Sequence, residues 1–423
     1  MPILEKLARL EDEKPAELEA WFADKRAEHL PMLTTSVDLR HSGKKLAPVD
    51  ANIYPAGFQN LSTNAQTRAA AQFQAAIEQA KSGAKNILIF PEAHTRNLPY
   101  LDNLASLQAI LQAAGFDVAI GTMLNNEGKK LALHRANGHT LEQYALEKQQ
   151  GQLQTICGFV PDVVLLNNDC TPGVPELLKD IAQPILPTPC MGWFQRKKSD
   201  HFSAYEALAS HFAHTFELDP WCLSAYFDCA RDINFKSRIG TDDLAKKVDT
   251  LITKIQHKYD EYGIQDTPYI YVKADSGTYG MGIMLVHDGS ELLELNKKQR
   301  NKMHVVKEST QVENVVLQEG VPTQDNIDGD PAEPMIYLVD GMPIGGMFRI
   351  NSGRDALGNL NASGMSFEGM CDSGEEEAEG LHKVAGCDFS AYGIIAGISA
   401  LAVGVEKKNL DAGKQADMQA QCV

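Results

Sequence analysis

The sequence predicts an α/β protein whose first half forms a parallel sheet and whose second half has an α+β pattern. Between residues 86 and 167, short apolar runs alternate with helical patterns at the spacing of parallel strands joined by helices. Beyond residue 195, two helical patterns precede a series of short strands. The chain has 423 residues, which is too long for a single hydrophobic core, so we expect two or three domains.

Composition limits the classes of partner. The net charge is −17, from 39 basic and 56 acidic residues, which argues against nucleic acid because binding to a phosphate backbone needs a basic surface. A small anionic ligand needs only a local basic pocket. The sequence has neither an apolar run of about 18 residues nor a secretory signal pattern, which predicts a protein outside the membrane. The eight cysteines have neither CxxC nor zinc spacing, which favours reduced thiols in the cytoplasm.

The first half contains most of the regular alternation. Residues 2–29 are expected to form one or two amphipathic helices, and residues 34–62 a long irregular segment of the kind that often carries function. Ser62 or Thr63 is expected to cap an alanine-rich helix that ends near Gly83. The next predicted elements are a strand at 86–90, a helix at 98–114, a strand at 117–123, a helix at about 140–150 and a strand at 163–167. Polar residues follow these strands, at the position where open α/β sheets bind ligands.

The second half begins after a proline-rich segment at 183–193, which is the expected crossing between domains. The predicted elements are helices at about 200–217 and 241–262 and strands at 268–274, 281–286, 314–319, 335–340 and 343–350.

The stretch YIYVKADSGTYGMGIMLV, residues 269–286, predicts a strand, a glycine-rich loop and a second strand. Glycines let backbone N–H groups approach an anion, and Ser276 and Thr278 add hydroxyl donors. Lys273 ends the first strand, where its ammonium could reach a phosphate. The loop differs from the Walker and Rossmann loops, because no helix follows it. Two interpretations remain: a flap over nucleotide phosphates, or a glycine hairpin without a ligand.

Two later segments add groups that suit a nucleotide. The segment VVLQEGVP, residues 315–322, leads from a strand into a proline-bounded turn, whose backbone groups could read an adenine edge. The segment 335–365 predicts a hairpin followed by a loop rich in Gly, Asn and Ser. Arg349 and Arg354 bring positive charge to this loop, which suits a second anion or a phosphoryl group in transit. An ordinary hairpin with a polar turn is the alternative.

The order of these segments resembles the ATP-grasp ligases of the glutathione synthetase type. The whole chain resembles the proteobacterial form of the glutamate–cysteine ligase family, from DLRHSGKKL onward. The resemblance implies a helical segment at 1–33, an α/β substrate-binding domain at 34–190 and an ATP-grasp domain at 191–423. Within the last domain it implies a glycine-loop lid at about 195–314 and a nucleotide-binding subdomain at about 315–415.

The resemblance also implies a reaction. With ATP and Mg²⁺, the γ-carboxylate of L-glutamate would form an acyl phosphate, and the amine of L-cysteine would displace the phosphate, which is the first step of glutathione biosynthesis. Two alternatives stay open: another ATP-grasp amino-acid ligase such as glutathione synthetase, or a nucleotide-binding regulatory protein without turnover. The expected partners are small molecules, and a homo-oligomer is possible.

By the same resemblance, Lys273 contacts the phosphates of ATP and Arg349 stabilises the transferred phosphoryl group. Asn361, like Asn359, lies in the loop that faces the phosphates and the substrate. Lys273, Arg349 and Asn361 are the catalytic candidates. The nucleotide-binding candidates are Lys273, Ser276, Gly277, Thr278, Tyr279, Gly280, Gln318, Glu319, Gly320 and Val321. Related enzymes hold Mg²⁺ on a late Glu-x-Asn strand, which this sequence lacks after residue 365. The metal candidates are therefore Asp340, Glu319, Asn361 and Glu368.

The amino-acid substrates carry carboxylates, which need Arg or Lys, and ammonium groups, which need acids. The substrate-binding candidates are Arg40, Lys44, Glu92, His94, Arg96, Asn168, Trp193, Arg196 and Lys198. For His94 a structural role is the alternative, and for Asn168 a role in a turn. The basic residues at 196–198 could also form a solvated turn.

Overall fold

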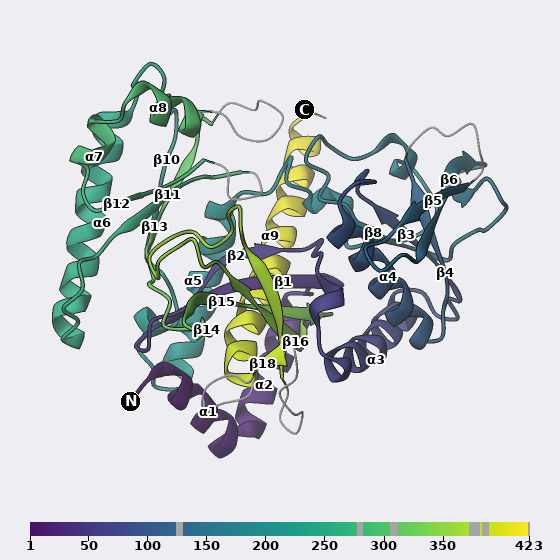
Figure 1. Cartoon of the computed structure of the whole chain (residues 1–423), viewed down its shortest axis with the longest axis horizontal. Helices are drawn as coiled ribbons and strands as arrows, with labels where there is room; N and C mark the ends of the chain where they lie inside the picture. Colours follow the sequence, from purple (N-terminus) through teal and green to yellow (C-terminus); the bar gives the residue numbers. More distant parts are fainter. Residues whose placement is uncertain (124–129, 277–281, 305–311, 372–380, 383–388, 422–423) are drawn as a thin grey trace.

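The computed structural model describes the chain except for residues 124–129, 277–281, 305–311, 372–380, 383–388 and 422–423. The described residues form three β-sheets with helices packed between and around them (Figure 1). In this view the small four-stranded sheet lies at the left, a sheet built around β3 and β8 lies at the right, and a central sheet lies between them. The predicted mixed α/β class is confirmed.

The central sheet joins segments from both ends of the chain. Its order is β18-β17-β16-β15-β1-β2, with β14 paired to β15. Val37 of β1 lies opposite Ile336 of β15 in an antiparallel pair. The strands are β1 (Thr34–His41), β2 (Leu46–Asn52), β14 (Asn326–Ile327), β15 (Asp330–Val339), β16 (Met342–Ile350), β17 (Ser366–Met370) and β18 (Leu381–His382).

The prediction of an irregular segment at 34–62 was wrong, because its first part forms β1 and β2. Val37 and Leu39 are fully buried on one face of β1, and Asp38 and Arg40 alternate with them on the other face. This pairing joins β1 and β2 to strands made of residues 326–382. The domain boundaries near residues 33 and 190 stay predictions.

The β3 sheet has the order β5-β6-β4-β3-β8-β9, with β7 paired to β6. The strands β3, β4, β8 and β9 pair in parallel, at the residues expected for the first three. Its strands are β3 (Asn86–Pro91), β4 (Asp117–Thr122), β5 (Lys130–His134), β6 (Thr140–Gln149), β7 (Gln152–Thr155), β8 (Val163–Asn167) and β9 (Ile185–Leu186). Helix α4 (Leu98–Ala113) contacts β3 and β4, and helix α3 (Thr63–Ala80) packs against α4 and against β15 and β16 of the central sheet. Ser62 Oγ caps α3, as predicted, by accepting a hydrogen bond from the Ala65 N–H at 3.2 Å.

The helix predicted at 140–150 is the strand β6 instead. Its Leu, Glu, Gln and Lys residues favour a helix intrinsically, but pairing with β4, β5 and β7 overrides that preference. Leu141 and Gln143 are buried on one face of this strand, with the period of two that a strand requires.

The small sheet is antiparallel, with the order β10-β13-β11-β12. Its strands are β10 (Phe227–Ala230), β11 (Ile270–Ala274), β12 (Ile283–Val286) and β13 (Val315–Glu319). Helix α6 (Thr241–Tyr262) contacts β10 and β13. The short helices α7 (Ser290–Leu293) and α8 (Lys297–His304) follow β12.

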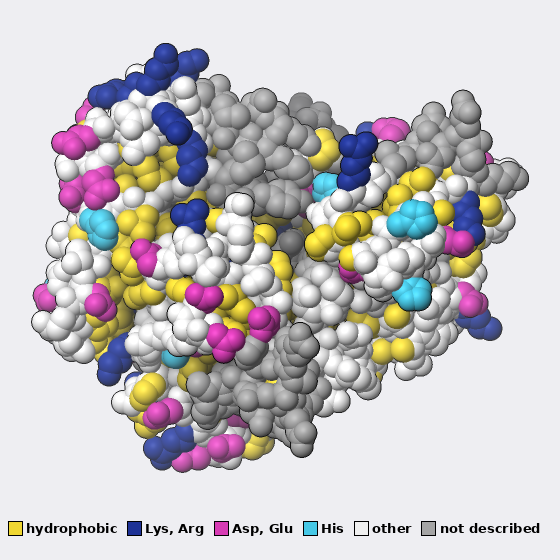
Figure 2. Space-filling model, viewed as in Figure 1, with side chains coloured by type: hydrophobic (Ala, Val, Ile, Leu, Met, Phe, Trp, Pro, Cys, Tyr) yellow, Lys and Arg dark blue, Asp and Glu magenta, His cyan; other side chains and the backbone are white. Residues whose placement is uncertain are grey.

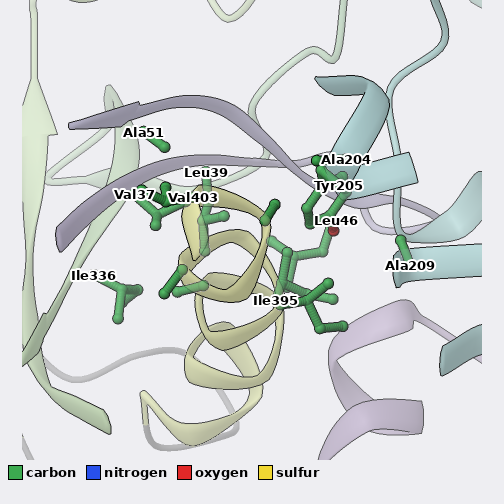
Figure 3. Close-up of a cluster of buried hydrophobic side chains, with 14 of the residues drawn as sticks. Val37, Leu39, Leu46, Ala51, Ala204, Tyr205, Ala209, Ile336, Ile395 and Val403 are labelled. Atoms are coloured by element: carbon green, nitrogen blue, oxygen red, sulfur yellow. The ribbon is translucent and has the colours of Figure 1, made fainter. Parts of the chain in front are cut away.

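The core is organised around helix α9 (Ser390–Gln421), which crosses the middle of the molecule (yellow in Figure 1). It contacts α1 (Ile3–Glu13), α2 (Pro15–Glu28), α5 (Lys198–Thr215) and the strands of the central sheet. Ile395 and Val403 of α9 pack with Leu39 and Ile336 in the buried cluster of Figure 3. The described residues also form four short 3₁₀ helices: η1 (Phe58–Asn60), η2 (Glu176–Leu178), η3 (Pro189–Met191) and η4 (Pro220–Cys222). None of the described helices is long and apolar enough to cross a membrane.

Candidate active site

A charged cavity lies between the central sheet and the small sheet. It is lined by Asp38, Arg40, Val49, Asp50, Lys198, Tyr271, Lys273, Ala274, Ser276, Ile283, Glu333, Arg349, Asn359 and Asn361. Its four cations are almost entirely buried, whereas the basic side chains of α8 gather on the molecular surface (Figure 2). Buried cations beside buried acids around a cavity mark a candidate site for a small charged ligand.

Two arginines share one acid at the bottom of this cavity. Arg40 Nε donates to Glu333 Oε2 at 2.7 Å, and Arg349 Nη1 donates to the other oxygen of Glu333 and to Asp38 Oδ2, the latter at 2.7 Å. Burial alone would raise the pKa of Glu333, but the two arginines lower it, so the carboxyl is ionised. Burial raises the pKa of Asp38, and Arg349 offsets this only in part. Arg349 Nε is buried and has no hydrogen-bond partner among the described residues, so it can donate to an anion.

Two lysines line the opposite side. Lys198 Nζ donates to Asp50 Oδ1 at 2.6 Å, while Lys273 Nζ donates to Gln318 Oε1 at 2.6 Å and to the Val49 carbonyl at 3.2 Å. Burial lowers the pKa of Lys273 to about 8, although Asp50 acts in the other direction. For Asp50, burial is outweighed by Lys198, Lys273 and Arg196, which together lower its pKa to about 2. Lys273 therefore titrates just above neutral pH.

The lowered pKa of Lys273 predicts a pH dependence. If the charged ammonium binds phosphate, kcat/KM for ATP should fall about tenfold per pH unit above roughly pH 8, because the lysine then loses its proton. The corresponding fall in kcat should begin at a higher pH, since a bound phosphate favours the charged form of the lysine. Steady-state kinetics between pH 6 and pH 10 measures both limbs. The Lys273→Arg variant stays charged throughout, so a limb that persists unchanged in it would belong to another group.

The loop of residues 351–365, named here the asparagine loop, forms one wall of the cavity. Asn359 and Asn361 line the cavity, and residues 352–355 of the same loop are exposed on the solvent side. Asn351 holds the loop from within by donating to the carbonyl of Leu360 at 3.2 Å. The loop therefore separates the cavity from solvent.

Arg40 supports this loop. Its Nη1 and Nη2 donate to the carbonyls of Ala356 and Gly358 at 3.0 and 2.6 Å, and its Nε is paired with Glu333. Arg40 lies in the cavity as predicted, but all three of its nitrogens already donate to protein atoms. Three of its five N–H groups are thus engaged, and its role as a fork for a substrate carboxylate stays a prediction.

Gln318 and Glu319 lie on opposite faces of β13. Gln318 faces Lys273, and its buried Nε2 has no hydrogen-bond partner in the described part of the chain. Glu319 instead lines a second cavity with Lys44, Gly320 and Val321. There Glu319 forms a buried ion pair with Lys45 at 2.6 Å and accepts a hydrogen bond from Trp221 Nε1 at 3.1 Å. Among the described nucleotide-binding candidates, Lys273 and Ser276 line the charged cavity, whereas Glu319, Gly320 and Val321 line the second one.

The predicted metal residues are not brought together. Asp340 occupies the turn between β15 and β16, Glu319 lines the second cavity, and Asn361 lines the charged cavity. Glu368 lies on β17, opposite Phe348. Among the described residues, no three His, Cys, Asp or Glu side chains form a group that could hold a metal ion.

Sequence reasoning missed the carboxylates of the charged cavity. Asp38 of β1 and Asp50 of β2 lie directly opposite each other in the strand pairing, and Glu333 lies on the neighbouring strand β15. Asp50 and Asn52 form an Asp-x-Asn pattern on a strand beside one that carries an acid. This pattern resembles the Glu-x-Asn pattern that the sequence lacks after residue 365, but it stands near the start of the chain.

Three substrate candidates lie where β3 and β8 end. Glu92 Oε1 accepts a hydrogen bond from the Asp169 N–H at 2.7 Å, and Asn168 Nδ2 donates to the Pro91 carbonyl at 3.1 Å. His94 packs edge-on against Tyr100, with ring centroids 5.5 Å apart. The hydrogen bonds of Asn168 fit its alternative role in a turn. Arg96 is exposed beyond β3.

The Trp193 region links these strand ends to the charged cavity. The Trp193 N–H donates to the Asp169 carbonyl at 3.0 Å, and Lys198 Nζ lies 4.7 Å from the centre of the Trp193 ring. Arg196 is buried, and it donates to both oxygens of Glu406 at 2.9 and 3.0 Å and to the Ala51 carbonyl at 2.9 Å. The alternative of a solvated turn is therefore wrong for Arg196, whereas its role in substrate binding stays a prediction.

The glycine loop is only partly described. Ser276 is exposed and lines the charged cavity. The predictions for Gly277, Thr278, Tyr279 and Gly280 lie outside the described residues.

Comparisons with known proteins agree on one family. The sequence profile of GshA, described as glutamate-cysteine ligase, matches residues 9–407. A protein provisionally named gamma-glutamylcysteine synthetase from Methylobacillus flagellatus KT, with a crystal structure at 1.90 Å, is 37% identical over 96% of each chain, with a TM-score of 0.87. The D-alanyl-alanine synthetase A of Vibrio cholerae O1 biovar eltor is 12% identical over 63% of this chain and 67% of its own, with a TM-score of 0.28. No curated protein matches the sequence. The chain belongs to the GshA glutamate–cysteine ligase family.

Proposed function

We propose that the charged cavity is the site where the γ-carboxylate of L-glutamate is activated by ATP and then joined to L-cysteine. As a glutamate–cysteine ligase, the enzyme catalyses the first step of glutathione synthesis. The observation that supports this site is the meeting of Lys273, Arg349, Asp38 and Asp50 in one cavity between two sheets. These groups suit a reaction that needs positioned phosphates and neutralised charge more than covalent help from the protein.

In this proposal the nucleotide lies between the small sheet and the central sheet. Lys273 binds its phosphates, and the free Nε of Arg349 donates to the phosphoryl group as it passes to glutamate. The unpartnered Nε2 of Gln318 offers a donor for the adenine ring. The attacking carboxylate oxygen bonds to the γ-phosphorus as the bond to ADP breaks. The cysteine amine then bonds to the acyl carbon, and phosphate leaves with the bonding electrons.

Magnesium fits the oxygen donors of the cavity. Mg²⁺ commonly takes one or two carboxylates from the protein and completes its octahedral shell with substrate phosphates and water. Asp38 and Asp50, which lie opposite each other, would hold the ion, with Glu333 nearby. The ion would neutralise charge on the phosphates.

Asp50 allows a direct test of the metal assignment. The Asp50→Asn variant should need at least about tenfold more Mg²⁺ for half-maximal turnover, because an amide binds the ion more weakly than a carboxylate. Binding of Mn²⁺ with a non-hydrolysable ATP analogue, followed by electron paramagnetic resonance, should weaken in parallel. Asp228→Asn is the matched control, since Asp228 also pairs with a lysine, Lys247, but outside the cavity. An unchanged metal requirement in Asp50→Asn would remove this residue from the metal site.

The amino acids enter, in this proposal, from the side of the β3 sheet. The ends of β3 and β8 carry Glu92 and Asp169, and the Trp193 contacts connect them to Lys198. Lys198 is thus placed to bind a substrate carboxylate between the strand ends and the phosphates. The proposal also assigns the chain the ATP-grasp arrangement and the proteobacterial form of the family, with domain boundaries at residues 33 and 190. It further places the protein in the cytoplasm, where its thiols are reduced.

An assay of ADP release with different amino-acid pairs tests the function. Purified protein with Mg-ATP, glutamate and cysteine should release ADP and form γ-glutamylcysteine. Release only with γ-glutamylcysteine and glycine would assign a glutathione synthetase activity instead. Tight ATP binding without turnover for any pair would leave a regulatory nucleotide-binding protein. With glutamate labelled by ¹⁸O in its γ-carboxylate, the released phosphate should carry one ¹⁸O atom, and its absence would exclude the acyl phosphate.

A further inference from the structure

Two side chains from different sheets hold three consecutive carbonyls of the asparagine loop. Arg40 of the central sheet donates to the carbonyls of Ala356 and Gly358 at 3.0 and 2.6 Å. Tyr271 of the small sheet donates its hydroxyl hydrogen to the carbonyl of Leu357, between them. The asparagine loop is therefore hydrogen-bonded to both the central sheet and the small sheet, at three consecutive residues.

Tyr271 owes its position to the alternation of β11. Tyr271 and Lys273 are two residues apart and both line the charged cavity, so the lysine and the tyrosine point from the same face of the strand. Burial raises the pKa of the Tyr271 hydroxyl to about 12, although Arg40 opposes this. The hydroxyl therefore stays protonated and donates at physiological pH. A contact of this kind couples the small sheet to the loop that carries Asn359 and Asn361.

We propose that Tyr271 is a positioning residue that fastens the asparagine loop to the small sheet and so keeps water away from the acyl phosphate. This inference rests on the proposed function, because it needs an acyl phosphate in the cavity. With the hydrogen bond in place, the loop wall and the small sheet move as one unit around the reacting groups. Without this hydrogen bond, the asparagine loop can separate from the small sheet, while Arg40 still holds the loop to the central sheet.

If the asparagine loop separates from the small sheet, water can reach the acyl phosphate. Water would add to the acyl carbon, the bond from that carbon to the phosphate oxygen would break, and glutamate and phosphate would leave. ATP would then be consumed without forming a peptide. The ratio of ADP released to γ-glutamylcysteine formed reports this leak, whereas a variant that is merely less stable would lose both products equally.

The experiment compares Tyr271→Phe with Tyr269→Phe. Tyr269 lies on the same strand, with its ring centre 5.6 Å from that of Tyr271, and its buried hydroxyl has no hydrogen-bond partner in the described part of the chain. Both variants lose one hydroxyl, but only the first loses the contact with the loop. ADP is measured by a coupled assay, the dipeptide by mass spectrometry and the phosphate label with γ-carboxyl-¹⁸O glutamate. Thermal melting shows that each variant is folded.

Wild type and Tyr269→Phe should release about one ADP per dipeptide, and Tyr271→Phe at least about two, with the excess phosphate carrying ¹⁸O. The rate of dipeptide formation should fall about fivefold, the scale of one lost hydrogen bond. Arg40→Lys, which keeps a charge beside Glu333 but loses the two carbonyl contacts, should leak in the same way. A ratio near one in Tyr271→Phe overturns the inference and leaves the proposed function intact. Unlabelled phosphate or no dipeptide from the wild type overturns both.

Discussion

The Lys273→Ala variant is expected to turn over ATP at least about 100-fold more slowly than wild type with glutamate and cysteine, the scale of losing one electrostatic stabiliser. Gln318 and the Val49 carbonyl hold Lys273 Nζ in a buried position. After its removal, nothing at that place supplies an equivalent positive charge. The loss should appear in kcat as well as in kcat/KM, because the γ-phosphate gains charge on its way to glutamate. Initial rates of ADP release measure it.

The control for Lys273→Ala is Lys247→Ala. Lys247 also belongs to the half of the chain that carries the small sheet and pairs with an acid, Asp228, but it is 41% exposed and lies outside the charged cavity. Its removal should leave the rate within about twofold of wild type. A rate for Lys273→Ala that equals that of the control would exclude Lys273 from phosphate binding, provided that both variants melt at the wild-type temperature.

The Glu406→Ala variant is expected to lower the free energy of unfolding by about 3–5 kcal/mol. Glu406 of α9 is 3% exposed and accepts two hydrogen bonds from Arg196. Its Oε1 also lies 2.6 Å from His201 Nδ1. Its removal leaves the buried Arg196 guanidinium without an acid. Urea denaturation followed by tryptophan fluorescence measures the change.

Glu13→Ala provides the comparison for Glu406→Ala. Glu13 also pairs with an arginine, Arg9, but the two side chains are 55% and 61% exposed, so water replaces the lost contact. We expect no measurable change in its denaturation midpoint. Equal stability of Glu406→Ala and wild type would mean that Arg196 finds another acceptor or enters water.

The sequence was most informative where a single segment carries the whole signal. The strands at 86–91, 117–122 and 163–167 are short and largely apolar, because both of their faces are buried: Ile87 and Ile89 pack in the cluster that includes α3 and α4, and Leu88 and Phe90 pack in the other large cluster. Lys273 and Arg349 were also found from local patterns, a lysine before a glycine loop and an arginine at the end of a hairpin strand. The structure places both at the same cavity.

The signal failed where a partner lies far away in the chain. The prediction of an irregular segment at 34–62 missed the alternation of β1, whose partner strand β15 lies in the second half of the chain. The guanidinium of Arg196 looked available to a ligand, since its acid, Glu406, is 210 residues away. The metal candidates Asp340, Glu319, Asn361 and Glu368 all come from the second half of the chain, although the paired acids Asp38 and Asp50 lie on its first two strands. Such assignments depend on tertiary pairing, which a single sequence does not reveal.

The pairing of β1 with β15 has a consequence for synthesis on the ribosome. Arg40 and Glu333, which meet in the finished cavity, are 293 residues apart. At typical elongation speeds, roughly 15 to 60 seconds pass between the appearance of the two residues. The β3 sheet is assembled from neighbouring segments and can fold during that interval, but β1 and β2 must wait with their hydrogen-bonding edge unmatched. The charged cavity can therefore be completed only after residue 333 has been synthesised, because β1 has no partner strand β15 before then.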